Sequence, residues 1–230
     1  MPGRVVSGLR NFSSIFSVAE FSARKVCDLP LYKRMHFDDD TSYSSGKHLP
    51  TNWQVEWDDS SQEYFVVDNY TDGASVTKAK CFKNRDYDAS YRSHCLSRYF
   101  PGGSPARNYS KGSVVFFATS PTVSGAKCAY GVKSTNYSPS INEYSGSAVV
   151  EFNSSGIFSG GSNLGSWTAD RWYEIRFDFD CSTGKYDLWI NGTSQGQFNL
   201  GYSPTALDRV TVYTQDDAVC YIHEVYFARL

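Results

Sequence analysis

The sequence is poor in the residues that build helical proteins. It has 2 Met and few Leu among 230 residues, while aromatic residues make up 16% of the chain and Tyr, Phe, Val, Ser and Thr are abundant. This composition is typical of β-structure. It excludes a helical bundle, a coiled coil and a collagen-like fibre. The many aromatic residues also exclude global disorder, because they can bury a sizeable core.

The chain also lacks any run of about 18 apolar residues, so we expect no membrane span. Its first residues, MPGRVVSGLRNFSSIF, lack the continuous apolar core of a secretory signal. The protein is therefore expected to stay where it is made, to have lost its signal, or to leave by another route such as cell lysis. A basic excess is missing as well: the formal net charge is −2, which argues against non-specific nucleic-acid binding.

The small net charge hides an asymmetry along the chain. Residues 1–36 carry six basic and two acidic residues, whereas the remainder is acidic overall. We therefore predict an N-terminal arm over residues 1–45. Ser17-Val18-Ala19-Glu20 is a capping box that predicts a short helix to about Asp28, before Pro30. This helix either covers an edge of the main domain or docks on a partner.

Cysteine pairs with metal-ligand or redox spacing are missing. None of the six Cys lies in a C-x-x-C motif, so zinc-ribbon and thioredoxin functions have no support. Six Cys in 230 residues are too few for a disulfide scaffold. We predict free, mostly buried thiols; one or two disulfides are the alternative if the protein resides outside a cell.

From about Leu49 onward the sequence predicts short strands separated by turns. In residues 172–180 apolar and charged residues alternate strictly, and residues 186–190 alternate again before an Asn191-Gly192 turn. The apolar last segment, 219–227, predicts a central strand. Such spacing indicates an antiparallel two-sheet sandwich, with further strands expected at 53–57, 64–67, 74–82, 113–118, 148–152 and 209–213.

Several of these segments together resemble a known family. They are Trp172–Asp180, Thr183-Gly184-Lys185-Tyr186, Asn191-Gly192 and Tyr221–Tyr226. Their order resembles the laminin-G-like domains of the concanavalin A-like lectin/glucanase superfamily, over about residues 46–230. The resemblance implies an all-β jelly roll with one concave face. Members of the superfamily include sugar-binding modules, polysaccharide lyases, glycoside hydrolases, adhesion modules and virion surface proteins, so function must come from the site.

The resemblance also implies one metal ligand. Where the family often has paired Asp residues in the last strand, sometimes at a structural calcium, this chain has His223-Glu224. Glu224 is the predicted calcium ligand, together with oxygens from the entry segment at Leu49–Trp53. Histidine binds calcium poorly. The cofactor prediction is therefore none, with calcium as the alternative.

Catalytic glucanases of this superfamily place two glutamates on one strand face with an aspartate between them. Here the nearest pattern is Glu174, Arg176, Asp178 and Asp180, with an arginine in the middle. A lyase would need a Tyr or His base beside a neutralising Arg, for which Arg176 and His223 supply residue types. We expect a solvated strand face instead, since neither family's full motif is present. No nucleophile elbow or phosphate-binding loop occurs in the sequence.

The same strands offer a binding surface. Trp189 alternates onto the outward face with Asp187, and in a hairpin it would lie beside Glu174, Arg176 and Asp178. An exposed Trp among Arg and Asp suits sugar recognition, by ring stacking and hydrogen bonds to hydroxyls. These five residues are the predicted glycan site. The alternative is that Trp189 packs under a loop or at a subunit contact.

The function predicted from these observations is a non-catalytic jelly-roll module that decorates a virion surface and binds glycans. Residues 1–45 would anchor it to other virion or assembly subunits, and we expect a homo-oligomer and no nucleic-acid partner. A carbohydrate-active enzyme, either a lyase or a glycoside hydrolase acting on the concave face, is the alternative. A cellular adhesion module is a third hypothesis.

Overall fold

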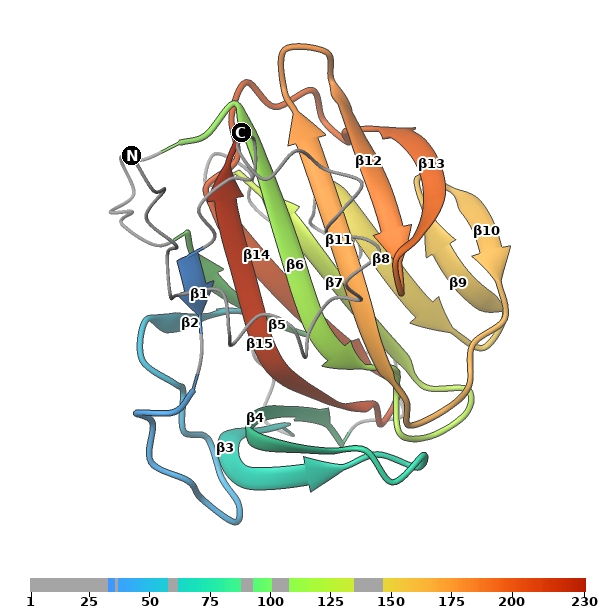
Figure 1. The fold of residues 1–230 in the computed structure, drawn as a ribbon. Coiled ribbons are helices and arrows are strands. Elements are labelled where there is room, and N and C mark those ends of the chain that lie inside the picture. Colours follow the sequence, from blue (N-terminus) through green and yellow to red (C-terminus); the bar gives the residue numbers. More distant parts are fainter. Residues whose placement is uncertain (1–32, 36, 58–61, 88–92, 101–107, 135–146) are drawn as a thin grey trace, which may run out of the picture. The chain divides into compact units, whose positions relative to one another are not determined.

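The computed structural model describes residues 33–35, 37–57, 62–87, 93–100, 108–134 and 147–230 (Figure 1). The chain divides into two compact units, Met1–Leu31 and Tyr32–Leu230, and the fold below is that of the second. The helix predicted between residues 17 and 28 lies outside the described residues. The described residues contain strands and no helix, so none of them forms a helix that could cross a membrane.

Two antiparallel sheets form a sandwich, which confirms the predicted fold class. Sheet A has the strand order β13 (Thr193–Asn199), β12 (Lys185–Ile190), β11 (Trp172–Asp180), β6 (Lys111–Thr119), β15 (Val219–Arg229), β4 (Thr77–Asp86) and β3 (Gln62–Thr71), with β1 (Lys33–Met35) beside β15. Sheet B has the order β10 (Ser162–Gly165), β9 (Gly156–Ser159), β8 (Ala148–Asn153), β7 (Lys127–Lys133), β14 (Arg209–Gln215), β5 (Ser93–Tyr99) and β2 (Trp53–Trp57).

The core lies between the inner faces of the two sheets. Alternation in β11 and β12 places the predicted apolar residues there: Ile175, Phe177 and Phe179 from β11 are buried, as are Tyr186, Leu188 and Ile190 from β12. The two strands form a hairpin in which Phe177 pairs with Leu188. The outward side chains of β11 and β12 must therefore share the outer face of sheet A.

The last strand is central, as predicted. β15 lies between β6 on one side and β4 and β1 on the other. Its register with β6 shifts between Ile222 and Glu224, where His223 is the extra residue. This β-bulge reverses the alternation, so Tyr221 precedes it and Glu224 and Tyr226 follow it on the same outer face, while Ile222 and Val225 enter the core.

Asn191-Gly192 forms the predicted turn and joins β12 to β13, a strand that the sequence did not predict. Both residues have positive φ, 50° and 75°, which is the combination that a two-residue type I′ turn requires. Ile190 pairs with Thr193 across it. The turn fixes the register of β12 and so the side to which Trp189 points.

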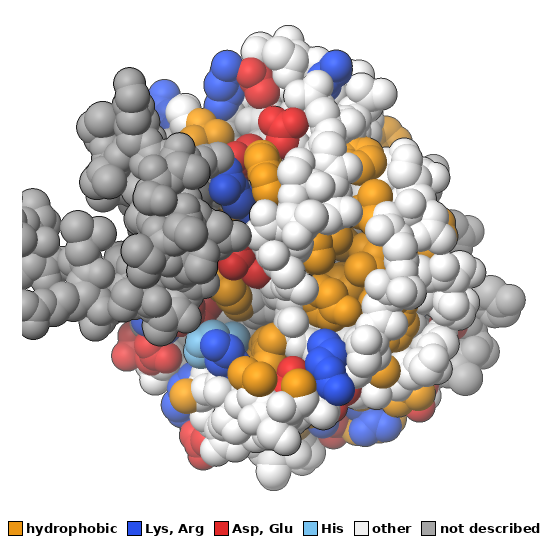
Figure 2. Space-filling view, turned by 45° about the vertical axis from the view of Figure 1, so that its right-hand side comes forward, with side chains coloured by type: hydrophobic (Ala, Val, Ile, Leu, Met, Phe, Trp, Pro, Cys, Tyr) orange, Lys and Arg blue, Asp and Glu red, His pale blue; other side chains and the backbone are white. Residues whose placement is uncertain are grey.

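The side of the molecule that carries the edge strands β13 and β10 has a hollow in which apolar side chains gather (Figure 2). Leu164 of β10 and Phe198 of β13 are partly buried against the core. Gly160, in the β9–β10 turn, has φ +53°, and a Cβ there would come within 2.9 Å of the Phe198 ring. Glycine is therefore needed where the edges of the two sheets approach.

The described cysteines are free, as predicted. Cys81, Cys95, Cys128 and Cys220 are buried and Cys181 is half-buried, and none of these five forms a disulfide. Cys27 lies outside the described residues. Burial raises the pKa of the Cys81 thiol to about 12 and that of Cys181 to about 11. These thiols are therefore protonated at neutral pH and are poor nucleophiles.

Part of the predicted arm packs along sheet A. β1 pairs with β15, and the chain then follows edge strand β3 through isolated parallel bridges from Ser42 to Val66 and from Lys47 to Tyr64. Met35 and Phe37 enter the core. Residues 33–35 and 37–45 thus belong structurally with the sandwich.

Asp180 at the β11–β12 turn should make stability depend on pH. Its carboxylate pairs with Lys111 at 2.6 Å and accepts bonds from Ser182, and these contacts lower its pKa from 3.8 to about 2. A depressed acid pKa stabilises the fold above the unfolded-state value, and this contribution is lost as pH falls toward 2. In urea titrations, Asp180→Asn should cost about 1 kcal/mol at pH 6 and almost nothing at pH 2. A cost independent of pH would contradict this assignment.

Candidate functional site

The outer face of sheet A brings the predicted sugar-binding residues together. Arg176 and Trp189 are direct cross-strand partners in the β11–β12 hairpin, and the guanidinium carbon lies 4.3 Å from the centre of the indole ring. This is a cation–π contact. The guanidinium therefore lies over one face of the half-buried Trp189 ring. We call Glu174, Arg176, Asp178, Asp187 and Trp189 the Trp189 site.

Asp178 fixes the position of Arg176. The Nε of Arg176 donates to Asp178 Oδ1 at 2.9 Å, and Nη2 donates to Oδ2. Ser113, on neighbouring β6, donates to Oδ1 at 2.5 Å. The side chains of Arg176 and Asp178 expose only 16% and 12% of their surface. Because Asp178 accepts hydrogen bonds from two nitrogen atoms of Arg176, the guanidinium is preorganised. Its charge is already neutralised by the Asp178 carboxylate.

The rim of the Trp189 site carries further carboxylates. Asp187 lies opposite Asp178 in the hairpin and accepts a bond from Gln197 of β13 at 3.2 Å. Glu174 is held through its backbone, whose N–H donates to Asn191 Oδ1 at 2.9 Å. The site thus has three carboxylates and one guanidinium. Its other end carries Asp180 with Lys111 and Lys185.

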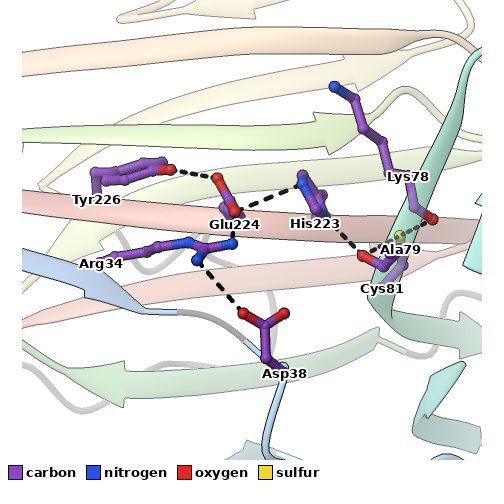
Figure 3. A network of polar contacts seen from close by, with 8 residues as sticks. All are labelled: Arg34, Asp38, Lys78, Ala79, Cys81, His223, Glu224 and Tyr226. Carbon is purple, nitrogen blue, oxygen red and sulfur yellow. Dashed lines mark hydrogen bonds and ion pairs between the residues drawn. The ribbon is translucent and has the colours of Figure 1, made fainter. Parts of the chain in front are cut away.

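The centre of the same face holds a buried acid that the sequence assigned to calcium (Figure 3). Glu224 exposes 4% of its surface. Arg34 of β1 donates to its Oε1, and the Tyr226 hydroxyl donates to its Oε2. Arg34 also pairs with Asp38 at 3.4 Å. Burial and the neighbouring carboxylate raise the pKa of Tyr226, so its hydroxyl stays a donor.

This geometry argues against calcium at Glu224. A guanidinium occupies the carboxylate, where a second cation would be repelled. No group of three or more His, Cys, Asp or Glu in the described ranges could hold a metal ion. His223 does not add a cation: its pKa is lowered, chiefly by burial, and its Nδ1 lies 2.8 Å from the Ala79 carbonyl oxygen. Calcium at Glu224 remains a prediction that these contacts disfavour.

One end of the outer face is bounded by an aromatic cluster that sequence reasoning missed. The β3–β4 hairpin curls over the sheet, so that Tyr70 stacks on Tyr221 at 3.4 Å and meets Trp172 edge-on at 6.1 Å. Asp170 accepts the Tyr70 hydroxyl at 2.6 Å. Asp72 accepts the backbone N–H of Trp172 at 3.2 Å, which ties the hairpin tip to β11. The alternation in β11 predicts that Trp172 lies on the outer face, but the sequence does not predict its contact with Tyr70.

Glu174 and Asp178 of β11 are not arranged as a glycosidase pair. A glycosidase needs two carboxyl groups at about 5–9.5 Å, one of them free to act as nucleophile or base. Arg176 lies between Glu174 and Asp178, whose Cα atoms are about 13 Å apart along a strand. Both oxygens of Asp178 are already bonded to Arg176. A lyase would require a cation that neutralises the uronate carboxylate. Arg176 is not available for this role because it is already paired with Asp178.

Comparison with known proteins bears on the fold alone. No family model and no curated protein sequence matches the chain. Among solved structures, a sialidase superposes with a TM-score of 0.59 at 12% identity, covering 78% of this chain and 17% of the sialidase. The carbohydrate recognition domain of Emp47p superposes with 0.52 at 11% identity, over 85% and 94% of the two chains. Crh5 transglycosylase in complex with NAG gives 0.50 at 8%, over 86% and 83%.

The fold is therefore a two-sheet antiparallel β-sandwich similar to those in these three structures. The chain spans only a small part of the sialidase, and at these identities the neighbours give no residue-level correspondence. Any activity must come from the residues that this chain places on its own sheet faces.

Proposed function

We propose that this protein is a non-catalytic, laminin-G-like jelly-roll module that binds glycans on the outer face of sheet A. The observation that carries the proposal is the preorganised Trp189 site. The Arg176 guanidinium lies over one face of a half-buried indole, with Asp187 and Gln197 on the rim. Sugars are recognised by an apolar ring face with a few oriented polar groups around it.

The pairing of Asp178 with Arg176 supports binding rather than turnover. Asp178 is committed to Arg176 and Ser113. The hydrolase or lyase alternative would need Asp178 or Arg176 released from this pairing. Binding needs no such change, because the rim groups and the indole already face outward.

The proposed ligand is a neutral glycan. The Trp189 site has an excess of carboxylates, and its one guanidinium is neutralised by Asp178. A uronate or sialate would therefore meet repulsion of about 1 kcal/mol, or about fivefold in Kd. We expect neutral oligosaccharides to bind better than their acidic counterparts in calorimetry at low salt. Asp187→Asn should reduce the difference in Kd between neutral and acidic oligosaccharides. Tighter binding of the acidic sugar would contradict the charge argument.

We further propose that, of the arm predicted over residues 1–45, the part that precedes β1 anchors the module to a larger assembly such as a virion, as part of a homo-oligomer with the sandwich facing outward. Support comes from the basic N-terminal segment on an acidic chain. Charge reversal of Arg24 and Lys25 to Glu in the full chain should abolish co-sedimentation with purified particles and leave glycan binding unchanged. Unchanged co-sedimentation would contradict the anchoring role.

The glycan-binding function is tested by screening the full chain on an array of neutral and acidic glycans, followed by chromatography of each ligand after long incubation. We expect retention of neutral glycans with their chain length unchanged. Shortened or unsaturated products that disappear in Glu174→Gln or Asp178→Asn would establish the enzyme alternative. Retention of no glycan would overturn the binding function.

A further inference from the structure

Cys128 and Cys220 lie opposite each other across the core, one in each sheet. The register of four strands places them there. Asn84 of β4 donates through Nδ2 to Thr214 Oγ1 of β14 at 3.2 Å, which joins sheet A to sheet B. Cys220 of β15 is the cross-strand partner of Asn84, and Cys128 of β7 is the cross-strand partner of Thr214. Because β15 and β7 both lie on the side of this contact toward β13 and β10, the two cysteines form the next facing pair.

The sandwich is narrow at this layer. Cα atoms of β4 and β14 come within 8 Å of each other, whereas stacked sheets usually lie about 10 Å apart. The four residues of the layer have short side chains, which lets the sheets approach. A disulfide needs Cα atoms about 4.4–6.8 Å apart, so a narrow layer is the place where a bond between two sheets fits.

The two thiols are also in contact. A side-chain hydrogen bond joins Cys128 to Cys220, and the Cys128 thiol lies 3.8 Å from the Tyr130 hydroxyl. Tyr130 donates its own proton to the Thr119 carbonyl at 2.5 Å, so that hydroxyl is fixed beside the sulfur atoms. Both cysteines expose 0% of their surface and belong to the core. The sulfur atoms therefore already share one small space that is closed to solvent.

We propose that Cys128 and Cys220 form a disulfide that joins sheet A to sheet B when the chain folds in an oxidising environment. The Cys128 thiolate attacks a small-molecule disulfide such as oxidised glutathione, which gives a mixed disulfide and releases one small thiol. The Cys220 thiolate then attacks Cys128 Sγ and displaces the second small thiol. Two protein thiols thus become one disulfide, and the small disulfide is reduced to two thiols.

Burial decides when this exchange can occur. In the folded chain, burial and then the neighbouring Cys220 thiol raise the pKa of the Cys128 thiol, so the attacking thiolate is scarce. The absence of exposed surface on either cysteine also separates both from an oxidant in solution. The bond must therefore form before the sheets close. A chain that folds under reducing conditions keeps both thiols, which is the form described above.

The test is to unfold the full chain in urea and refold it with either reduced glutathione alone or a mixture of reduced and oxidised glutathione. After alkylation, we expect the second product to be lighter by two hydrogen atoms and to give a cross-linked peptide pair that contains Cys128 and Cys220. The bond closes a loop of about 90 residues, so the urea midpoint should rise by about 1.5 M over that of the reduced chain.

Cys128→Ala and Cys220→Ala should each lose the cross-link and the midpoint shift. Cys81→Ala is the matched control and should keep both, because Cys81 is equally buried but its thiol donates to the Lys78 carbonyl of its own strand at 3.3 Å.

Three results would overturn the proposal: alkylation of both Cys128 and Cys220 after oxidising refolding, a cross-link of either one to another cysteine, or a bridged chain that is no more resistant to urea. The mass measurement on the wild-type chain decides the first two even if an alanine variant fails to fold. None of these results depends on glycan binding, so the proposed function stands or fails separately.

Discussion

Replacing Trp189 with alanine is expected to weaken binding of neutral oligosaccharides by about 30-fold. The indole provides the apolar surface of the site, and a Trp at the centre of an interface contributes about 2 kcal/mol when truncated. Arg176, which lies over the ring at 4.3 Å, would also lose its stacking partner. Trp189→Phe keeps an aromatic face and should lose much less. Isothermal calorimetry on the full chain measures all three affinities.

The matched control is Tyr213→Ala. Tyr213 is a half-buried aromatic residue on β14, in the other sheet. Its removal should change the affinity by less than twofold. Thermal unfolding of each variant separates lost binding from lost folding. If Trp189→Ala binds as tightly as wild type, or if Tyr213→Ala weakens binding equally, the outer face of sheet A is not the glycan surface.

The largest expected effect on stability is at the Arg34–Glu224 pair, and it should be asymmetric. The Glu224 side chain is 5% exposed, whereas the Arg34 side chain is 41% exposed. Arg34→Ala would leave a buried carboxylate without its cation, at a cost of about 2–3 kcal/mol. Glu224→Gln would leave Arg34 partly hydrated and paired with Asp38, at about 1 kcal/mol or less. Urea titrations at pH 7 compare the two variants.

Arg229→Ala is the control for this pair, since Arg229 is an exposed arginine at the end of β15. It should change the free energy of unfolding by less than about 0.5 kcal/mol. A Glu224→Gln variant that is destabilised as much as Arg34→Ala would contradict the asymmetry. In that case Glu224 would stabilise the fold mainly through interactions other than its ion pair with Arg34 of β1.

The sequence predicted those parts of the site that follow from local alternation. Strict period-2 patterning of β11 and β12, joined by a turn, was enough to place Arg176 and Trp189 on one outward face. The Asn191-Gly192 turn was recognisable because few other residue pairs tolerate positive φ twice, but the strand that follows it was not. The central position of β15 followed from its largely apolar sequence, which only His223-Glu224 interrupts.

What the sequence could not supply depends on contacts between distant segments. Arg34 belonged to a presumed arm, and its pairing with Glu224, 190 positions away, arises only when β1 joins β15. The bulge at His223 reverses alternation in β15 and so conceals that Tyr221 and Tyr226 share a face. β13 escaped prediction because it is a polar edge strand with only one partner.

The most direct test of the glycan-binding account is an NMR titration of the full-length protein with a neutral oligosaccharide retained on the array. The account predicts saturable shifts of the Trp189 indole N–H and of the backbone amides of Arg176 and Asp187, with the oligosaccharide recovered intact. Shifts confined to other surfaces, or recovery of a cleaved sugar, would contradict it.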